Sequence, residues 1–154
     1  MTIYEILQIN PAEAAGLIDE LDGYLAALYP PESNHLESIE DLSRKNVRMF
    51  GCKINSEIVA IGAVKMMDSY GELKRLYVSP QYRGKKIAVE IMEHLESEIK
   101  QNNLDLARLE TGIYQVEAIT LFKRNGYTMC RPFGNYIDDP LSIFMEKRLQ
   151  PTKK

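Results

Sequence analysis

The spacing of apolar residues predicts alternating strands and helices along the whole chain. After an apolar start, apolar residues recur every three or four positions, as the buried stripe of an amphipathic helix requires. Asn10-Pro11-Ala12-Glu13 begins this helix with an N-cap residue, a proline in the first turn and a glutamate at the third position. Tyr29-Pro30-Pro31 ends it. The stripe consists of Ala14, Leu17, Ile18, Leu21, Leu25 and Leu28.

The period then changes from that of a helix to that of a strand. We expect strands at 47–54 and 57–67, joined by the tight turn Asn55-Ser56, and a third strand at 70–78. The other predicted elements are strands at 2–9, 106–111, 126–131 and 141–149 and helices at 34–45, 85–101 and 115–124.

These elements follow one another in the order β-α-α-β-β-β-α-β-α-β-β. The strand–helix–strand unit at 70–111 predicts a right-handed parallel crossover, and the hairpins on either side imply a mixed sheet. The expected fold class is therefore α+β (mixed α/β), with a central sheet of about seven strands and helices on both faces.

Length and composition narrow the class of protein. The 154 residues, 45% hydrophobic and 27% charged, predict a single globular domain spanning 1–154 and exclude a disordered chain. A net charge of −3 argues against a nucleic-acid partner. No apolar run approaches the ~20 residues of a membrane span, and the first residues lack the order of a signal peptide. The expected location is cytoplasmic, with no membrane partner.

The cysteines and histidines do not form a metal motif. Cys52 and Cys130 are far apart, and neither His35 nor His94 has a Cys or His neighbour at ligand spacing, so no metal site is expected. The sequence leaves a Cys–His nucleophile pair open, but it favours two reduced, buried thiols.

The most informative stretch runs from Val78 to Ala88, where a strand ends, a basic turn follows and a helix begins. Free N–H groups at a helix start attract anions, and three cations reinforce them here, while Gly84 permits close backbone approach to a phosphate. A Walker A loop and a dinucleotide-binding fingerprint both fail, because their glycines are missing. Taken alone, this turn fits an ordinary helix start with solvated lysines equally well.

A second motif favours the phosphate-binding interpretation of this turn. The segment 83–88, Arg-Gly-Lys-Lys-Ile-Ala, resembles the pyrophosphate loop of the GNAT superfamily of N-acetyltransferases, Gln/Arg-x-x-Gly-x-Gly/Ala, with Lys86 in place of the middle glycine. Residues 115–127 resemble the family's Asn-x-x-Ala-x-x-Leu-Tyr-x-x-x-Gly-Phe segment, with Gln115 for Asn and Phe122 for Tyr. The resemblance covers about residues 45–149, and it implies a GNAT-like fold.

The resemblance also implies the donor and its binding residues. Acetyl-CoA would lie between the two central parallel strands, with its pantetheine along Leu76, Tyr77 and Val78, and the Val78 N–H would polarise the thioester carbonyl. The second motif would pack along the thiol end through Gln115, Ala118 and Phe122. The expected pyrophosphate-binding residues are Arg83, Gly84, Lys85, Lys86, Ile87 and Ala88.

The chemistry requires a proton acceptor, because an amine with a pKa around 10 is protonated near neutral pH. Glu72 is one candidate base, since family members carry a catalytic glutamate at this distance before the strand end. Glu110, which ends the adjacent strand, is the other. Strict alternation would place Glu72, Lys74, Leu76 and Val78 on one side of the strand 70–78 and Leu73, Arg75 and Tyr77 on the other. Phe122 offers no proton to the leaving thiolate, so Tyr136, in the last loop, is a candidate acid.

Acceptor recognition is expected from the first helix exit and the last loop. Glu32, Asp138 and Asp139 would attract a cation, Arg75 would hold a carboxylate, and Tyr29 would form a wall. For each of these residues, the sequence favours the simpler interpretation of a polar surface turn.

The predicted activity is transfer of an acetyl group from acetyl-CoA to a primary amine, on a small molecule, by direct attack in a ternary complex. Two alternatives remain open: acetylation of a peptide or protein amine, and a non-catalytic acyl-CoA-binding regulator. Assembly as a homodimer also remains open.

Overall fold

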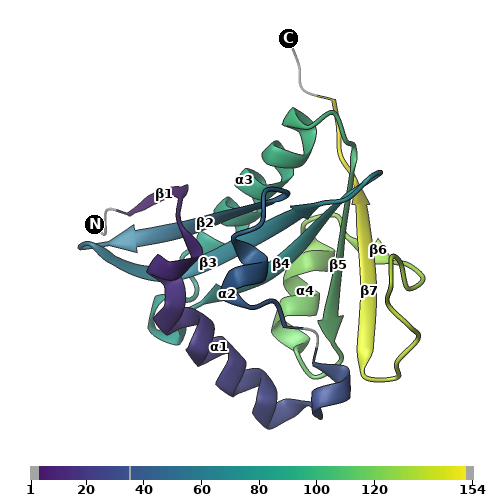
Figure 1. Ribbon diagram of the computed structural model, residues 1–154, viewed down its shortest axis with the longest axis horizontal. Coiled ribbons are helices and arrows are strands. Elements are labelled where there is room, and N and C mark those ends of the chain that lie inside the picture. Colours follow the sequence, from purple (N-terminus) through teal and green to yellow (C-terminus); the bar gives the residue numbers. More distant parts are fainter. Residues whose placement is uncertain (1–3, 35, 152–154) are drawn as a thin grey trace.

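The computed structural model describes residues 4–34 and 36–151 and contains a seven-stranded sheet with helices on both faces (Figure 1). The element order confirms the predicted one. The strands are β1 (Glu5–Gln8), β2 (Val47–Ile54), β3 (Glu57–Met66), β4 (Gly71–Val78), β5 (Leu106–Gly112), β6 (Thr128–Met129) and β7 (Ser142–Arg148). The helices are α1 (Ala15–Leu28), α2 (Ile39–Leu42), α3 (Ile87–Gln101) and α4 (Val116–Arg124). Short 3-10 turns, η1 (Pro11–Ala14), η2 (Pro31–Ser33) and η3 (Pro80–Tyr82), precede α1, α2 and α3.

The strand order in the sheet is β1-β2-β3-β4-β5-β7-β6, and every neighbouring pair is antiparallel except β4 and β5. The parallel crossover predicted for 70–111 is thus confirmed. Pairing of β4 with β5 covers only Gly71–Leu73 against Ala107–Leu109. Beyond these residues the two strands diverge toward their carboxyl ends (Figure 1).

The sheet separates two apolar cores. One contains Ile87, Ile91, Leu95 and Phe122 of α3 and α4, packed on one face of β2–β5. The other contains residues of α1 and α2 packed on the opposite face; Ile18, Leu21, Leu25 and Leu42 are all buried there. Of the expected α1 stripe, Leu17 and Leu28 are only partly buried. The face covered by α1 and α2 is the one on which the charged residues of β4 lie.

A β-bulge at Arg75 breaks the alternation of side chains along β4. The register on β3 moves from Ala63 opposite Lys74 to Ile61 opposite Tyr77, so β4 has one residue more than β3 over this stretch, and Arg75 has a φ of 57°. The expected alternation is therefore wrong beyond Lys74. Leu73, Leu76 and Val78 face the α3 core, whereas Tyr77 faces the α1 core. The residues whose side chains share the α1 side are Glu72, Lys74, Arg75 and Tyr77.

Two predicted elements are shorter in the structure for local reasons. The helix expected at 34–45 is confined to α2, where Ser38 caps the helix through the Asp41 N–H, and the Glu37 carbonyl accepts from the Arg75 guanidinium instead of from a helical N–H. The strand expected at 126–131 is reduced to β6, because Gly126 has a φ of 95° and ends α4. The first two residues of the strand expected at 2–9 lie outside the described part of the chain.

The start of α3 differs from the expected Lys85. Gly84 has a φ of 82°, and Lys86, the N-cap, has a φ of 63°. Lys86 thus adopts the left-handed conformation that glycine adopts most easily, at the position where the resembled motif has a glycine. The replacement of the motif's glycine by Lys86 therefore keeps the backbone conformation of this turn.

The strand position opposite the bulge has no room for a side chain. A Cβ at Gly62 would lie 2.6 Å from Cγ2 of Ile91 and 3.2 Å from Cδ1 of Leu76. We expect Gly62→Ala to lower the free energy of unfolding by about 1–3 kcal/mol, because it pushes α3 away from the sheet. Gly16→Ala, at an exposed site in α1 with nothing within 4 Å, is the control and should keep or raise stability. Thermal unfolding of both variants measures this, and equal melting temperatures would contradict the packing argument.

Candidate active site

A groove of about 890 Å³ opens where β4 and β5 diverge. We call it the donor groove. Its walls are the end of β4 (Leu76–Val78), the turn before α3, the length of α4 and Leu21 and Tyr24 of α1. Of the residues expected to hold acetyl-CoA, only Lys85 does not border this groove.

The turn before α3 is held by its own side chains. Arg83 donates from Nε to the Val78 carbonyl oxygen at 2.9 Å, and its guanidinium lies over the Tyr77 ring. Lys85 lies over Tyr82 instead of pointing into the groove, with Nζ 5.8 Å from the ring centroid. A Cβ at Gly84 would meet nothing within 4 Å, so this residue leaves its backbone open toward the groove.

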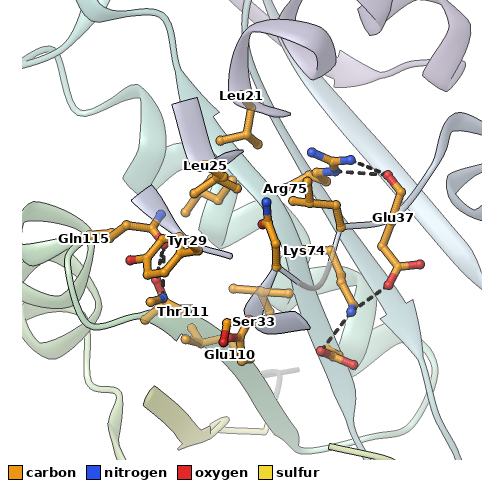
Figure 2. Close-up of a pocket in the computed structure, with 18 of the residues that line it drawn as sticks. Leu21, Leu25, Tyr29, Ser33, Glu37, Lys74, Arg75, Glu110, Thr111 and Gln115 are labelled. Carbon is orange, nitrogen blue, oxygen red and sulfur yellow. Dashed lines mark hydrogen bonds and ion pairs between the residues drawn. The ribbon is translucent and has the colours of Figure 1, made fainter. Parts of the chain in front are cut away.

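A smaller cavity of about 110 Å³ lies next to the donor groove on the α1 face of the sheet (Figure 2). We call it the acceptor pocket. Tyr29 and Ser33 border it on one side, Glu37 on another, and Glu72, Lys74 and Glu110 come from the two central strands. Five residues border both cavities and so mark their junction: Leu21, Leu76, Gln115, Ala118 and Phe122.

The junction includes one polar side chain. Oε1 of Gln115 accepts from the Gly112 N–H at 3.1 Å and from the Thr111 hydroxyl at 3.4 Å. Because Oε1 is used in these two contacts, the side-chain NH₂ group is the part of the Gln115 amide left to donate hydrogen bonds. Phe122, also at the junction, is buried and packs edge-on against Tyr127.

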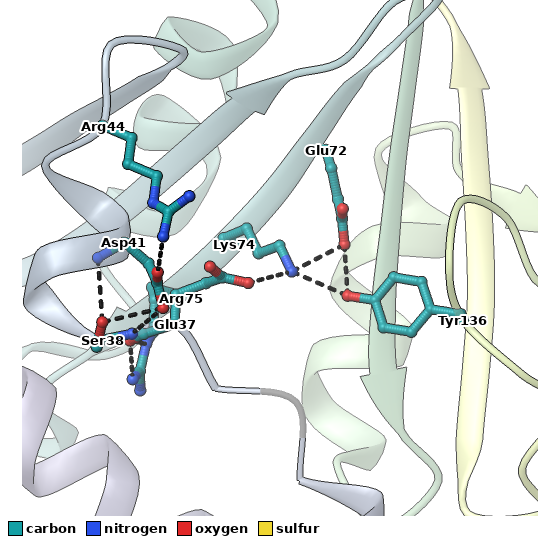
Figure 3. Close-up of polar contacts among 8 residues, drawn as sticks. All are labelled: Glu37, Ser38, Asp41, Arg44, Glu72, Lys74, Arg75 and Tyr136. Carbon is teal, nitrogen blue, oxygen red and sulfur yellow. Dashed lines mark hydrogen bonds and ion pairs between the residues drawn. The ribbon is translucent and has the colours of Figure 1, made fainter.

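A compact network of charges borders the acceptor pocket (Figure 3). Nζ of Lys74 lies 2.8 Å from Oε1 of Glu37, 3.1 Å from Oε2 of Glu72 and 2.9 Å from the Tyr136 hydroxyl. Tyr136 in turn donates to Oε2 of Glu72 at 2.6 Å. Glu72 is buried, and the Lys74 side chain is only 10% exposed.

The surroundings of this network change two of its pKa values. Burial lowers the pKa of Lys74, but the Glu72 charge, Tyr136 and Glu37 together outweigh burial, so the pKa of Lys74 is raised and the ammonium is retained. Burial and the Glu72 carboxylate raise the pKa of Tyr136, so this phenol stays protonated. The loop between β6 and β7 lies against β4 through these contacts. It places the Tyr136 hydroxyl in the acceptor pocket, not in the donor groove.

Glu110 lies on the same side of the sheet, one strand away. Glu72 pairs with Arg108 across the parallel strands, so Glu110 is two residues further along β5, toward the end where the strands diverge. Its Oε2 accepts from the hydroxyl of Ser142 at 2.8 Å. Glu72, by contrast, contacts the Lys74 ammonium and the Tyr136 phenol.

The expected acceptor residues fall into two groups. Tyr29 and Arg75 border the acceptor pocket, although Arg75 is paired with Asp22 of α1 and with the Glu37 carbonyl. Glu32, Asp138 and Asp139 do not border it. Asp139 accepts from the Ser33 hydroxyl at 2.7 Å, and this contact ties the last loop to the turn after α1.

Sequence reasoning missed Lys74 and Glu37 as site residues. Lys74 gave a signal, since a charge in the middle of a central strand needs a partner. Glu37 gave no such signal, because its contact with Lys74 depends on how the segment between α1 and α2 crosses β4.

Val78, whose N–H was expected to polarise the thioester carbonyl, borders only the donor groove. Leu76, two residues earlier, borders both cavities.

Cys52, Cys130 and His94 border neither cavity. Cys52 is fully buried, which raises its pKa to about 11, and Cys130 is half-buried. His94 is exposed on α3, and His35 lies outside the described residues. Within residues 4–34 and 36–151, no group of three or more His, Cys, Asp and Glu side chains is arranged to hold a metal ion, and no helix is long and apolar enough to cross a membrane.

Comparison with known proteins agrees with this geometry. The chain is 42% identical over 135 residues to an IAA acetyltransferase of Azospirillum brasilense, covering 86% of this chain and 88% of the relative. A crystal structure of a putative acyl-CoA N-acyltransferase from Klebsiella pneumoniae matches with a TM-score of 0.81 and 35% identity, covering 96% of this chain and 99% of that one. The fold also matches an N-acetyltransferase from Thermoplasma acidophilum, solved in complex with coenzyme A, with a TM-score of 0.72 and 20% identity over 95% and 99% of the two chains.

The family follows from these findings. The model of the Acetyltransferase (GNAT) family matches residues 14–127, so the chain belongs to this family. The resemblance seen in the two sequence motifs is confirmed, and so are the predicted fold and enzyme class: the protein is an acetyltransferase with a coenzyme A-based acyl donor.

Proposed function

We propose that this enzyme transfers the acetyl group of acetyl-CoA to the primary amine of a small molecule, by direct attack of the amine on the thioester. The junction of the two cavities is the observation on which this proposal depends. A thioester in the donor groove and an amine in the acceptor pocket would meet between Leu76 and Gln115, which border both. Holding both reactants at one point is a large part of the catalysis such a reaction needs.

The donor groove would bind acetyl-CoA mainly through backbone groups. The N–H groups from Gly84 to Ala88 lie at the N-terminus of α3, where the helix dipole and the free amides of a first turn favour a pyrophosphate, whereas the Arg83 N–H already donates to the Pro80 carbonyl. Arg83 and Lys86 border the groove and would add charge. The pantetheine would lie along β4, where pairing with β5 has ended. Because Leu76 rather than Val78 borders both cavities, we assign polarisation of the thioester carbonyl to the backbone near Leu76.

The acceptor pocket suits a small, positively charged amine. Its volume of about 110 Å³ is well below the roughly 300–1,000 Å³ of drug-sized sites. Three carboxylates and two cations border it, so its formal charge is negative, which favours an ammonium ion before reaction. A lysine side chain would satisfy the same charge, and this keeps a peptide amine as the second candidate acceptor.

We assign proton acceptance to Glu110. It lies on β5 directly after the last residue that pairs with β4, and it borders the acceptor pocket. Oε2 of Glu72 already accepts from Lys74 and Tyr136, so Glu72 would serve as a fixed negative charge for the incoming ammonium. A general base needs to lie within hydrogen-bond reach of the amine, directly or through one water.

The leaving thiolate has no phenol at the junction, since Phe122 occupies that place. Tyr136 donates to Glu72 and does not border the donor groove, so we assign it to positioning instead of to proton donation. A thiolate, whose conjugate acid has a pKa near 8.5, leaves without an acid far more readily than an alkoxide does. Solvent would supply the proton afterwards.

Release of free thiol from acetyl-CoA across a panel of small amines, amino acids, polyamines and peptides tests the proposal. We expect turnover with at least one small amine and formation of its N-acetyl product. Turnover with peptides alone would support the second candidate acceptor. Binding of acetyl-CoA without turnover on any amine would support a non-catalytic regulator, and it would contradict the proposed activity.

Donor binding can be tested through Gly84. The open space around Gly84 leaves room for a valine side chain, and the backbone strain that its φ of 82° imposes on valine falls in an exposed turn outside the core. We therefore expect Gly84→Val to keep the fold and to block approach of the pyrophosphate to the backbone. Acetyl-CoA should raise the melting temperature of the parent by mass action, and Gly84→Val should abolish that rise. Gly84→Asn, which tolerates a positive φ, separates backbone strain from the added side chain. If Gly84→Val binds acetyl-CoA as well as the parent does, the loop does not hold the phosphates.

The proton acceptor can be tested by comparing two isosteric variants. We expect Glu110→Gln to lower the turnover rate by about 10²–10⁴-fold, with a loss that shrinks at high pH as unprotonated amine becomes available. Glu72→Gln should keep the parent's dependence of kcat on pH and should weaken acceptor binding instead. The pH–rate profiles of both variants provide the measurement. The reverse pattern would make Glu72 the base.

A further inference from the structure

Lys74 is a nearly buried cation that the proposed reaction does not use directly. An ammonium group has three hydrogens, and Nζ of Lys74 has three partners: Glu37, Glu72 and the Tyr136 hydroxyl, all within 3.1 Å. Its donors are therefore used within the protein, and none remains for an acceptor molecule. The role of Lys74 must come from what it holds together.

The three partners of Lys74 belong to three separate parts of the chain. Glu72 is on β4, Glu37 is on the segment between α1 and α2, and Tyr136 is on the loop between β6 and β7 (Figure 3). Each of these residues borders the acceptor pocket, and none borders the donor groove. Moving Lys74 would therefore change the acceptor pocket on several sides at once and leave the donor groove as it is.

The bulge makes this arrangement specific. Because of the extra residue, Lys74 and Arg75 point to the same side of the sheet, and both bind Glu37: Lys74 binds its carboxylate, and Arg75 binds its carbonyl oxygen. Glu37 is thus fixed by two adjacent residues of β4. Arg75 is itself anchored to Asp22 of α1.

We propose that Lys74 is the positioning residue of the acceptor pocket, holding Glu37 and Tyr136 against Glu72 and so setting affinity for the acceptor without affecting the donor. This inference rests on the proposed function, since it assigns the pocket to the amine. It accounts for a lysine in the middle of a central strand, where a buried cation is costly unless its partners are complete.

The charge of Glu72 depends on its neighbours from every side. Lys74 is the ion-pair partner, Tyr136 donates to the carboxylate, and Glu37 is the second carboxylate of the network. Lys65 of β3 and Arg108 of β5 are the register partners of Glu72, and the Glu72 charge also acts on Tyr70. Without Lys74, the Glu72 carboxylate would stay buried but would lose its ion-pair partner, which is costly.

Lys74→Met tests the proposal, because methionine keeps the length of the side chain and removes the charge. We expect the KM for the best acceptor to rise, with a loss in kcat/KM of up to about 10²-fold, and the Kd for acetyl-CoA to stay unchanged. Lys147→Met is the matched control: Lys147 pairs with Glu96 of α3 and borders neither cavity. This control should keep the parent's acceptor KM.

The melting temperature supplies a readout that needs no turnover. Lys74→Met leaves the buried Glu72 carboxylate without its ion-pair partner, and the loss of one partner of a buried pair lowers stability. The variant should therefore melt at a lower temperature than the parent. Adding Glu72→Gln removes the unpaired charge and should restore part of this loss.

The outcomes separate this inference from the proposed function. If the parent acetylates no amine, the proposed function fails, whatever Lys74 does. If the parent is active and Lys74→Met has the parent's acceptor KM, the inference about Lys74 is wrong. Should Lys74→Met fail to fold, Tyr136→Phe removes only one hydroxyl of the network; a raised acceptor KM with unchanged acetyl-CoA affinity supports the inference, and an unchanged acceptor KM overturns it.

Discussion

One extra residue in β4 makes both halves of this site. The bulge at Arg75 lies two residues after Leu73, the last residue of β4 that pairs with β5, so the ladder between these strands ends just before the bulge. Beyond it, the backbone of β4 faces a groove instead of a strand. The same residue also turns Lys74 and Arg75 to one side of the sheet. Strict alternation would have sent Arg75 toward the α3 core, where its charge would have had no partner.

The charges beside the bulge are arranged to satisfy one another before any substrate arrives. Lys74 balances Glu37 and Glu72, and Arg75 balances Asp22. A buried ion pair of this kind adds little net stability, because desolvation offsets much of the attraction, but breaking it is costly. Such a network gives the pocket one defined shape. Because the contacts of Glu72 belong to this network, we assign proton acceptance to Glu110, the carboxylate on β5 that borders the same pocket.

The parts of the structure that could be predicted from sequence are those that depend on local patterns. Apolar periods gave the elements and their order, and Gly84 with its neighbouring cations indicated the phosphate-binding turn. Lys86 shows the limit of motif matching, since a non-glycine residue adopts the left-handed conformation of the motif's glycine. The bulge had no signature, because no glycine or proline marks Arg75. The contacts of Tyr136 with Lys74 and Glu72, 62 and 64 positions away, depend on tertiary packing.

This difference between local and distant contacts also separates the two functions of the site. The donor groove is also bordered by α4 and α1, but the part proposed to bind the pyrophosphate and pantetheine consists of short consecutive stretches at the start of α3 and along β4, where backbone conformation is decisive. The acceptor pocket is built from side chains that three distant segments bring together at Lys74 and Glu72. Changes in the segment between α1 and α2, or in the last loop, can therefore alter the acceptor pocket without disturbing the donor groove. On this reasoning, identity at the donor residues indicates a shared acyl donor, whereas a shared acceptor requires the same contacts at Lys74.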